Sequence, residues 1–324
     1  MKDVPRELID FFERYDAFYV IGHKEPDGDC VGSQLALASL LRRTGKDATV
    51  CSSGPFTRTE ILAFENRFSS VVPAEKASER AAAVILDCSS LGRIGSVAET
   101  LPPVQMAFID HHAAGEAVGE VVYIDDSAPS VTFMILRIIE AMGQKPTREE
   151  AELLLFGLCT DTGFFRHVDE TGSETFAAIS RLVAAGASPK RAFHQMYGGK
   201  SLFTRKLMGE ILMRTEPHFD GQLLVSYVTL EDQQRYGLAS RDSDMLYQLL
   251  LSVSGCEAAM IIRQESETDC TVGLRARERV DVGSIAARFG GGGHRLAAGL
   301  SIRGRPDEVL EKLTDAFAPF FDAD

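Results

Sequence analysis

The chain has 324 residues, of which 45% are hydrophobic and 25% are charged, the composition of an ordinary globular protein. It contains 34 Lys and Arg against 47 Asp and Glu, and a net charge of −13 argues against binding long duplex DNA through its phosphates. No apolar segment is long enough for a membrane span, and the N-terminal residues lack a signal-peptide pattern, so we expect a cytoplasmic protein. The six cysteines are scattered along the chain, and we expect them to be reduced.

Short apolar segments recur through the first half of the chain. Each is rich in β-branched or aromatic residues, which is typical of strands buried on both faces. They are residues 17–23, 47–52, 81–88, 104–110 and 120–125. Helical patterns at 31–43 and 130–142, and a capped helix after Thr147, lie between and beyond them. The alternation predicts an α/β domain over residues 1–187, with a parallel sheet and helices on both faces.

The pattern changes after this domain. Residues 188–216 are interpreted as a helical linker. Beyond it, a turn pair precedes an alternating segment, and residues 258–264 and 270–276 flank a polar turn, so two hairpins are expected. A final amphipathic helix is expected over 306–320. Residues 217–324 therefore predict a smaller α+β domain.

Acidic and histidine residues cluster at the ends of these elements. The clusters are His23 with Asp27 and Asp29, then Asp87, then Asp110 with His111 and His112, and finally Asp161. The first three follow predicted parallel strands, whose carboxyl ends share one edge of a sheet. Together they offer imidazole and carboxylate ligands for two divalent metals, with Mn²⁺ favoured and Mg²⁺ or Co²⁺ as alternatives. Any one cluster alone is an ordinary turn or helix cap, so the metal site is inferred from their convergence.

These clusters, in the contexts GHKEPDGDCVGS, VILDCSS, FIDHH and CTDTGFFR, resemble the four motifs of the DHH phosphoesterases. Residues 281–299, DVGSIAARFGGGGHRLAAG, resemble the glycine-rich signature of the DHHA1 domain. The resemblance extends over nearly the whole chain. It is to the bacterial nano-RNase, or bifunctional oligoribonuclease, type, whose members degrade very short RNAs and dephosphorylate 3′-phosphoadenosine 5′-phosphate (pAp).

The resemblance implies a role for each motif residue. One metal ion would take the ligands His23, Asp27 and Asp87. The other would take Asp29, Asp87, His111 and Asp161, so that Asp87 bridges the pair. Asp110 would orient a neighbouring imidazole, and His112 would lie near the substrate phosphate. Three cysteines adjoin the motifs and are expected to pack against the sheet: Cys30, Cys88 and Cys159.

The chemistry expected of such a centre is hydrolysis of a phosphoester. Two metals that share a water lower its pKa, and the resulting hydroxide attacks phosphorus in line. Four metal-binding aspartates against two dications leave the centre formally neutral, so the phosphate needs further donors. Near the metals we expect His112 and Arg166. In the second domain we expect Arg275, Gly291, Gly292, Gly293, His294 and Arg295, with the glycines allowing close backbone approach and a helix that begins near His294 adding its positive end.

The sequence thus predicts a two-metal phosphoesterase that hydrolyses short RNA to mononucleotides, pAp to AMP and phosphate, or both. A phosphodiesterase for linear dinucleotides (pApA or pGpG) is one alternative. An inorganic pyro- or polyphosphatase is another, which the glycine-rich second domain disfavours. The charge disfavours a processive DNA exonuclease, and the complete set of motif residues disfavours a non-catalytic sensor. The oligomeric state stays open, with a homodimer as one option.

Overall fold

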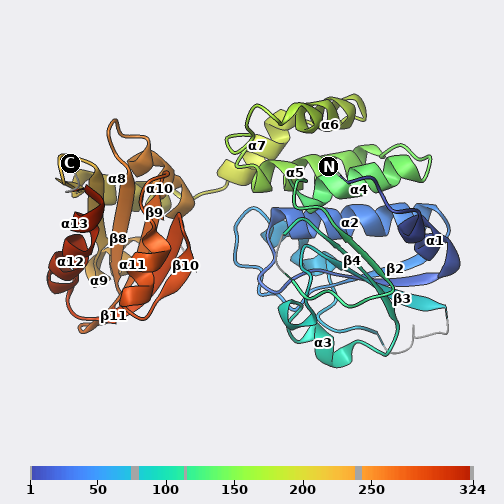
Figure 1. Ribbon diagram of the computed structural model, residues 1–324, viewed down its shortest axis with the longest axis horizontal. Helices are drawn as coiled ribbons and strands as arrows, with labels where there is room; N and C mark the ends of the chain where they lie inside the picture. Colours follow the sequence, from blue (N-terminus) through green and yellow to red (C-terminus); the bar gives the residue numbers. More distant parts are fainter. Residues whose placement is uncertain (1, 74–79, 113–114, 238–242, 322–324) are drawn as a thin grey trace. The chain divides into compact units, whose positions relative to one another are not determined.

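The computed structural model describes residues 2–73, 80–112, 115–237 and 243–321 (Figure 1). The chain divides into two compact units, Met1–Gly199 and Lys200–Asp324. The segment interpreted as a linker contains one helix of each unit, α7 (Pro189–Tyr197) and α8 (Leu202–Met213). Among the described residues, no helix is both long and apolar enough to cross a membrane.

A five-stranded sheet forms the centre of the first unit. Its strands are β1 (Ala17–Ile21), β2 (Asp47–Cys51), β3 (Ala81–Leu86), β4 (Gln105–Asp110) and β5 (Val121–Ile124). They lie in the order β2-β1-β3-β4-β5, and every pairing is parallel, as predicted. All six residues of β3 are buried. Because this strand is covered on both faces, its sequence is a continuous apolar run without alternation.

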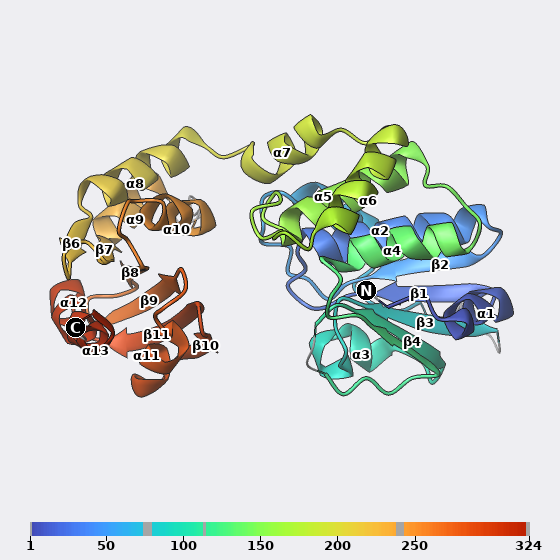
Figure 2. The same cartoon turned by 45° about the horizontal axis from the view of Figure 1, so that its top comes forward.

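Helices cover both faces of this sheet, but unequally (Figure 2). The larger core lies under α1 (Arg6–Arg14), α2 (Gly28–Arg43), α4 (Val131–Ala141) and α5 (Arg148–Asp161). The opposite face is covered by the short elements η3 (Leu91–Arg93) and α3 (Val97–Thr100) and by nearby loops. Among the described residues, three further elements belong to this unit: η1 (Leu62–Arg67), α6 (Ser173–Ala184) and α7.

Glycines allow the helices on the larger core to approach closely. A Cβ on Gly32 would lie 2.7 Å from the carbonyl oxygen of Leu153. A Cβ on Gly157 would lie 2.4 Å from Cγ2 of Thr132 and 3.1 Å from Cα of Asp29. Larger residues at either position would push α2, α4 and α5 apart. The close packing brings the start of α2 and the end of α5 together.

The strand order locates the crevice of this unit. The chain leaves β1 for β2 on one side and returns to β3 on the other side of β1. Such a reversal opens a crevice at the carboxyl ends of the two strands. His23 follows β1, Asp87 follows β3, and Asp110 ends β4, so these residues lie on adjacent strands at the same edge.

A six-stranded sheet forms the second unit, in the order β10-β11-β9-β8-β7-β6. Its strands are β6 (Glu216–His218), β7 (Leu223–Val228), β8 (Ala258–Gln264), β9 (Asp269–Ala276), β10 (Gly292–His294) and β11 (Ala297–Arg303). The pairings are antiparallel except that of β7 with β8, and both predicted hairpins, β6–β7 and β8–β9, are present. One core packs under α8, α9 (Leu230–Tyr236) and α10 (Ser243–Leu251). The other core packs under α11 (Val282–Arg288), α12 (Pro306–Thr314), η4 (Asp315–Phe317) and α13 (Ala318–Phe321).

The prediction of a helix that begins near His294 is wrong. His294 ends β10, an exposed strand paired with β11, and the nearest helix, α11, precedes the glycines. Glycine disfavours a helix, because it loses more conformational freedom there than other residues. Gly293 also has a φ of 145°, and a Cβ there would lie 2.5 Å from the carbonyl oxygen of Ala297. The predicted terminal helix forms, but the 3₁₀ turn η4 interrupts it.

Candidate metal centre

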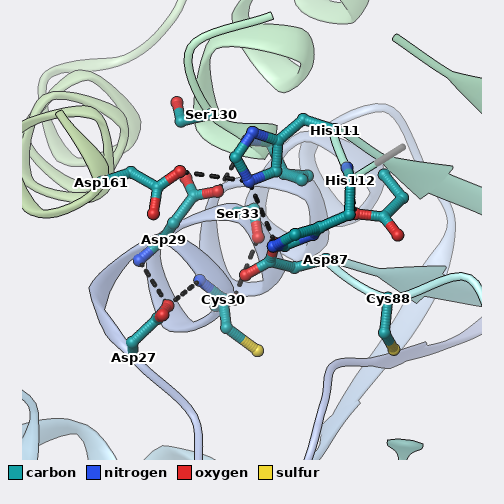
Figure 3. Close-up of polar contacts among 12 residues, drawn as sticks. Asp27, Asp29, Cys30, Ser33, Asp87, Cys88, His111, His112, Ser130 and Asp161 are labelled. Atoms are coloured by element: carbon teal, nitrogen blue, oxygen red, sulfur yellow. Dashed lines mark hydrogen bonds and ion pairs between the residues drawn. The ribbon is translucent and has the colours of Figure 1, made fainter. Parts of the chain in front are cut away.

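Side chains from four segments converge at the carboxyl edge of the parallel sheet (Figure 3). They come from the β1–α2 loop and first turn of α2, the ends of β3 and β4, and the end of α5. In three groups, potential ligand atoms lie within 4.8 Å of one another: His23 with Cys30 and Asp87, Asp87 with His111 and His112, and Asp29 with His111 and Asp161. The clusters that the sequence separates by tens of residues therefore lie together.

His23 and His111 both direct Nε2 toward carboxylates. Nδ1 of His23 lies 2.8 Å from the next residue's carbonyl oxygen, and Nδ1 of His111 lies 3.3 Å from the carbonyl oxygen of Ala128. Because a carbonyl oxygen only accepts, each Nδ1 carries hydrogen, which leaves the Nε2 atoms for the cluster. Nε2 of His23 lies 3.4 Å from Oδ2 of Asp87, and Nε2 of His111 lies 3.1 Å from Oδ2 of Asp161. A cation between nitrogen and oxygen, either a proton or a metal ion, stabilises each contact.

Asp87 lies at the centre of the cluster and is 2% exposed. Its φ of 60° is in the left-handed region, which costs a residue other than glycine free energy. Oδ1 has no hydrogen-bond partner among the described residues and lies 3.7 Å from Nε2 of His111 and from Nδ1 of His112. Burial and the charges of neighbouring aspartates raise the pKa of Asp87 well above its usual range. A buried carboxylate with an unpaired oxygen fits a site that holds a cation.

Burial disfavours the ionised form of Asp29 and Asp161 as it does that of Asp87. Asp29, in the first turn of α2, is fully buried. Its carboxylate meets the start of α4, where its oxygens accept hydrogen bonds from the backbone N–H groups of Val131 at 2.6 Å and Thr132 at 2.8 Å. Burial nevertheless raises the pKa of Asp29. Burial and the charges of Asp29 and Asp27 raise the pKa of Asp161 to about 9. With a pKa of about 9, Asp161 holds a proton at neutral pH in the absence of metal, and a divalent cation would displace it.

Asp27 and Cys30 belong to the first turn of α2. Oδ1 of Asp27 caps this helix by accepting from the backbone nitrogens of Asp29 and Cys30, both at 3.1 Å. The same oxygen lies 3.9 Å from Nε2 of His23. The Cys30 sulfur donates a weak hydrogen bond to Oε1 of Gln34 at 3.5 Å, yet it is also one of the clustered ligand atoms. The sequence places Cys30 next to the first motif, where it was expected to pack against the sheet, and the structure adds that its sulfur lies among the potential ligand atoms.

Asp110 and His112 form a hydrogen-bonded pair beside Asp87. Oδ1 of Asp110 lies 2.8 Å from Nδ1 of His112 and accepts from the backbone nitrogen of His112 at 3.1 Å. This pairing raises the pKa of His112. Burial opposes ionisation of Asp110, but the hydrogen bonds from His112 outweigh it, and the pKa of Asp110 is lowered. The His112 side chain is 54% exposed. With Nδ1 engaged, Nε2 is the ring nitrogen available to a ligand.

Besides Arg166, which the sequence suggested, two other arginines act on the charges of the cluster. Arg166 is exposed on the loop after α5, and its Nε donates to the carbonyl oxygen of Gly163 at 2.8 Å. Arg58 lies close enough for its charge to lower the pKa of Asp161, and Arg93 acts in the same sense on His112. Sequence reasoning missed both. Arg93 ends η3, the short helix that follows Asp87 in the chain, a position that could have marked it, whereas no local pattern marks Arg58.

The expected substrate contacts of the second unit lie on two strands of its sheet. Arg275 belongs to β9, and Gly292, Gly293 and His294 form β10, with Gly291 before it and Arg295 after it. All three residues of β10 are exposed. The guanidinium carbon of Arg275 lies 4.9 Å from the centroid of the Tyr247 ring.

Comparisons with known proteins agree with this organisation. Residues 17–158 match the model of the DHH family, N-terminal domain, and residues 220–322 match that of the DHHA1 domain. The bifunctional oligoribonuclease and PAP phosphatase NrnA of Thermus thermophilus is 31% identical over 302 residues, which cover 92% of this chain and 88% of that protein. The protein of the same name from Bacillus subtilis is 28% identical over 300 residues, covering 91% and 92%.

A solved structure supports the fold of the whole chain. An exopolyphosphatase-related protein from Bacteroides fragilis superposes with a TM-score of 0.83 at 24% identity, and the match covers 98% of this chain and 96% of that one. The similarity in sequence to NrnA and the two domain matches agree on the same assignment. The chain therefore belongs to the DHH family of phosphoesterases, in the group whose members also carry a DHHA1 domain.

Proposed function

We propose that the chain is a two-metal hydrolase that cleaves short RNA oligonucleotides to mononucleotides and pAp to AMP and phosphate. The substrates are proposed from the relatives named oligoribonuclease and PAP phosphatase, which this chain matches along most of their length. The observation that carries the metal chemistry is the unpaired, buried Oδ1 of Asp87 between two histidine rings. Without a bound cation, this buried carboxylate oxygen would lack a compensating interaction, which costs free energy.

The donor set fits two divalent cations. We assign His23, Asp27 and Asp87 to one ion, and Asp29, Asp87, His111 and Asp161 to the other. The orientation of both Nε2 atoms and the raised pKa values of the buried carboxylates support this assignment. Mixed imidazole and carboxylate ligands favour Mn²⁺ over Mg²⁺. When bound, such ions polarise a phosphoryl oxygen and lower the pKa of a water molecule.

The remaining residues of the centre act on the phosphate. Asp110 fixes the His112 ring by accepting a hydrogen bond from Nδ1, which leaves Nε2 to interact with the substrate phosphate. The raised pKa of His112 increases its protonated fraction near neutral pH, which provides positive charge for a phosphate oxygen. Arg93 and Arg58 add positive charge next to this cluster. Arg166 is assigned the same role, from an exposed position on the loop after α5.

In the second unit, we propose that β9 and β10 bind the rest of the substrate. The candidate contacts are Arg275, Gly291, Gly292, Gly293, His294 and Arg295. The exposed glycine backbone of β10 and the Arg275 side chain are suited to an anion. The six cysteines are buried and form no disulfide with one another, which supports a reducing compartment such as the cytoplasm.

A product assay tests the proposed function. The purified protein with excess Mn²⁺ is given a five-nucleotide RNA, pApA, pAp and pyrophosphate, and products are resolved by anion exchange. We expect mononucleotides from the RNA and AMP from pAp. Asp87→Asn should abolish both, whereas Asp125→Asn, which changes a buried aspartate at the end of β5 outside the cluster, should retain them. Turnover of pyrophosphate alone, or of nothing, would refute the proposal.

A further inference from the structure

The Cys30 thiol is a buried group at the metal centre to which the proposed function gives no role. Cys30 lies in the first turn of α2, directly after Asp29, and is 0% exposed (Figure 3). Its sulfur, a ring nitrogen of His23 and a carboxylate oxygen of Asp87 lie within 4.8 Å of one another. The ion that we assign to His23, Asp27 and Asp87 would therefore bind next to a sulfur atom.

Two strands and a helix hold this sulfur in place. A Cβ on Gly22, directly after β1, would lie 2.2 Å from Sγ of Cys30, so the sulfur occupies space that glycine leaves free. Gln34, one turn further along α2, donates from Nε2 to the carbonyl oxygens of Val20 at 3.0 Å and Cys51 at 2.9 Å. Because both hydrogens of this amide are engaged, its Oε1 faces Cys30 and accepts a weak hydrogen bond from Sγ at 3.5 Å. The sulfur is thus positioned by its neighbours, as the ligands of metal sites commonly are.

An independent feature of the same group indicates a bound cation. Oδ1 of Asp87 is buried and has no hydrogen-bond partner among the described residues. Oδ2 of the same carboxylate lies 3.4 Å from Nε2 of His23, whose Nδ1 faces a carbonyl oxygen. A cation beside this carboxylate would accept lone pairs from oxygen, nitrogen and sulfur together.

We infer that the Cys30 thiolate is a further ligand of the ion assigned to His23, Asp27 and Asp87, and that it raises the preference of this position for Zn²⁺ and Co²⁺ over Mn²⁺. The inference rests on the proposed function for the presence of that ion. Thiolate sulfur is a soft ligand that zinc accepts readily, whereas carboxylate oxygen suits Mn²⁺.

The thiol must lose its proton to act as this ligand. In the metal-free protein, burial and the charges of Asp87 and Asp27 raise the pKa of the Cys30 thiol well above its usual range, so the thiol is neutral. When the sulfur binds a divalent ion, the S–H bond breaks, the electron pair stays on sulfur and the proton passes to solvent. Metal binding thereby replaces a neutral thiol with a thiolate that is paired to the ion.

The two metal positions would then differ in their chemistry. The clustered ligand atoms of Asp29, His111 and Asp161 are nitrogen and oxygen only, so that position keeps the ordinary preferences of imidazole and carboxylate. The thiolate adds one negative charge to a centre whose aspartates formally balance two dications. Arg58 and Arg93, whose positive charges act on the cluster, offset this addition.

Cobalt substitution tests the sulfur ligand directly. A thiolate bound to Co²⁺ gives an intense near-ultraviolet charge-transfer band, which imidazole and carboxylate ligands do not give. The full chain is freed of metal with EDTA, the chelator is removed by dialysis, and Co²⁺ is titrated in without oxygen or added thiols. We expect the band to reach its full intensity with the first equivalent of Co²⁺. Bound Co²⁺ without this band would overturn the inference, and a band that appears only with the second equivalent would refute the preference.

Two buried cysteines next to motif aspartates provide the variant and its matched control. Cys30→Ser, whose hydroxyl can still donate to Gln34, should lose the band, and so should Cys30→Ala. Cys88 is also buried and follows Asp87, but its sulfur lies 3.6 Å from the carbonyl oxygen of Leu86 and is absent from the clustered ligand atoms of the described residues. Cys88→Ser should therefore retain the band. A band that persists in both Cys30 variants, or that is lost in folded Cys88→Ser, would contradict the assignment.

Metal affinities separate a ligand from a residue that only supports the site. Dissociation constants for Zn²⁺ and Mn²⁺ are measured by competition with a chelating dye. Cys30→Ser should weaken the tighter Zn²⁺ site at least about tenfold and change Mn²⁺ affinity by less than about threefold. An equal loss for the two metals would show that Cys30 supports the shape of the site without binding the ion, and would overturn the inference.

The same data separate this inference from the proposed function. Two bound Co²⁺ ions without a sulfur band would refute Cys30 as a ligand and leave the two-metal centre intact. A chain that binds no divalent ion would overturn both proposals. A band that is lost in Cys30→Ser, in a protein that hydrolyses neither short RNA nor pAp, would retain Cys30 as a ligand and refute the proposed function.

Discussion

Asp161 provides a test of the electrostatics of the candidate centre in the absence of metal. Its pKa is about 9 in the folded protein against an ordinary value of 3.8, so the folded state holds this proton more tightly than the unfolded chain does. Replacing Asp161 by Asn removes the ionisable group but keeps the shape of the side chain. The amide can also donate to Nε2 of His111, which lies 3.1 Å from Oδ2 of Asp161. We expect Asp161→Asn to stabilise the metal-free protein.

The size and the pH dependence of this effect follow from linkage. Below pH 3.8 the carboxyl is protonated in both states, and it contributes no difference. Between pH 3.8 and 9 the unfolded chain ionises while the folded protein does not, so wild-type stability falls by up to about 1.4 kcal/mol per pH unit. At pH 7.5 the upper limit is about 5 kcal/mol. Because a quarter of the side chain is exposed and His111 can share the proton, we expect a gain of about 1–3 kcal/mol.

Urea unfolding in EDTA at pH 5, 6, 7 and 8 measures this difference. The advantage of Asp161→Asn should grow with pH, and excess Mn²⁺ should reverse it by stabilising the wild type, which keeps all the ligands of both ions, more than the variant. Asp125→Asn is the matched control. Hydrogen bonds, chiefly from Ser127, outweigh burial and lower the pKa of Asp125, so its replacement should cost stability at neutral pH. An advantage of Asp161→Asn that stays constant with pH, or a loss of stability at pH 8, would refute the reasoning.

Three further changes address single contacts. Asp87→Asn should lower kcat/KM for pAp at least about a hundredfold in steady-state assays. Circular dichroism should show that the metal-free variant stays folded, and full activity would contradict the role of Asp87. Asp110→Asn should lower the pKa of His112, because the charged partner of Nδ1 is lost, and an unchanged NMR titration of this ring would count against the pairing. Gly157→Ala should lower the free energy of unfolding by about 1–3 kcal/mol through its clash with Thr132, whereas Gly209→Ala should not destabilise; equal unfolding midpoints would argue against close helix packing.

The parallel sheet could be predicted because burial on both faces leaves a clear trace in the sequence. The run AAAVIL of β3 is apolar throughout and lies at the middle of the sheet. The convergence of His23, Asp87 and Asp110 followed from the same prediction, since strand ends share an edge. These features follow from local sequence patterns, combined with the general geometry of parallel sheets.

Other features depend on packing that the sequence does not display. The glycine run was expected to lead into a helix, but pairing with β11 makes it a strand. Arg58 lies far from Asp161 in sequence, and only the fold brings its charge close. Tyr247 likewise meets Arg275 only because Gly273 leaves space for its ring. Contacts of this kind join separate elements and have no local signature.

The most direct test of the two-metal centre is the stoichiometry of Mn²⁺ binding. Equilibrium dialysis followed by elemental analysis gives the number of ions per chain, and the electron paramagnetic resonance spectrum reports whether bound ions are coupled. The wild type should bind two coupled Mn²⁺ ions. Asp87→Asn should lose the coupling and bind at most one ion tightly, because Asp87 is assigned to both. A wild type that binds a single ion, or none, or an Asp87→Asn variant that keeps two coupled ions, would contradict the account.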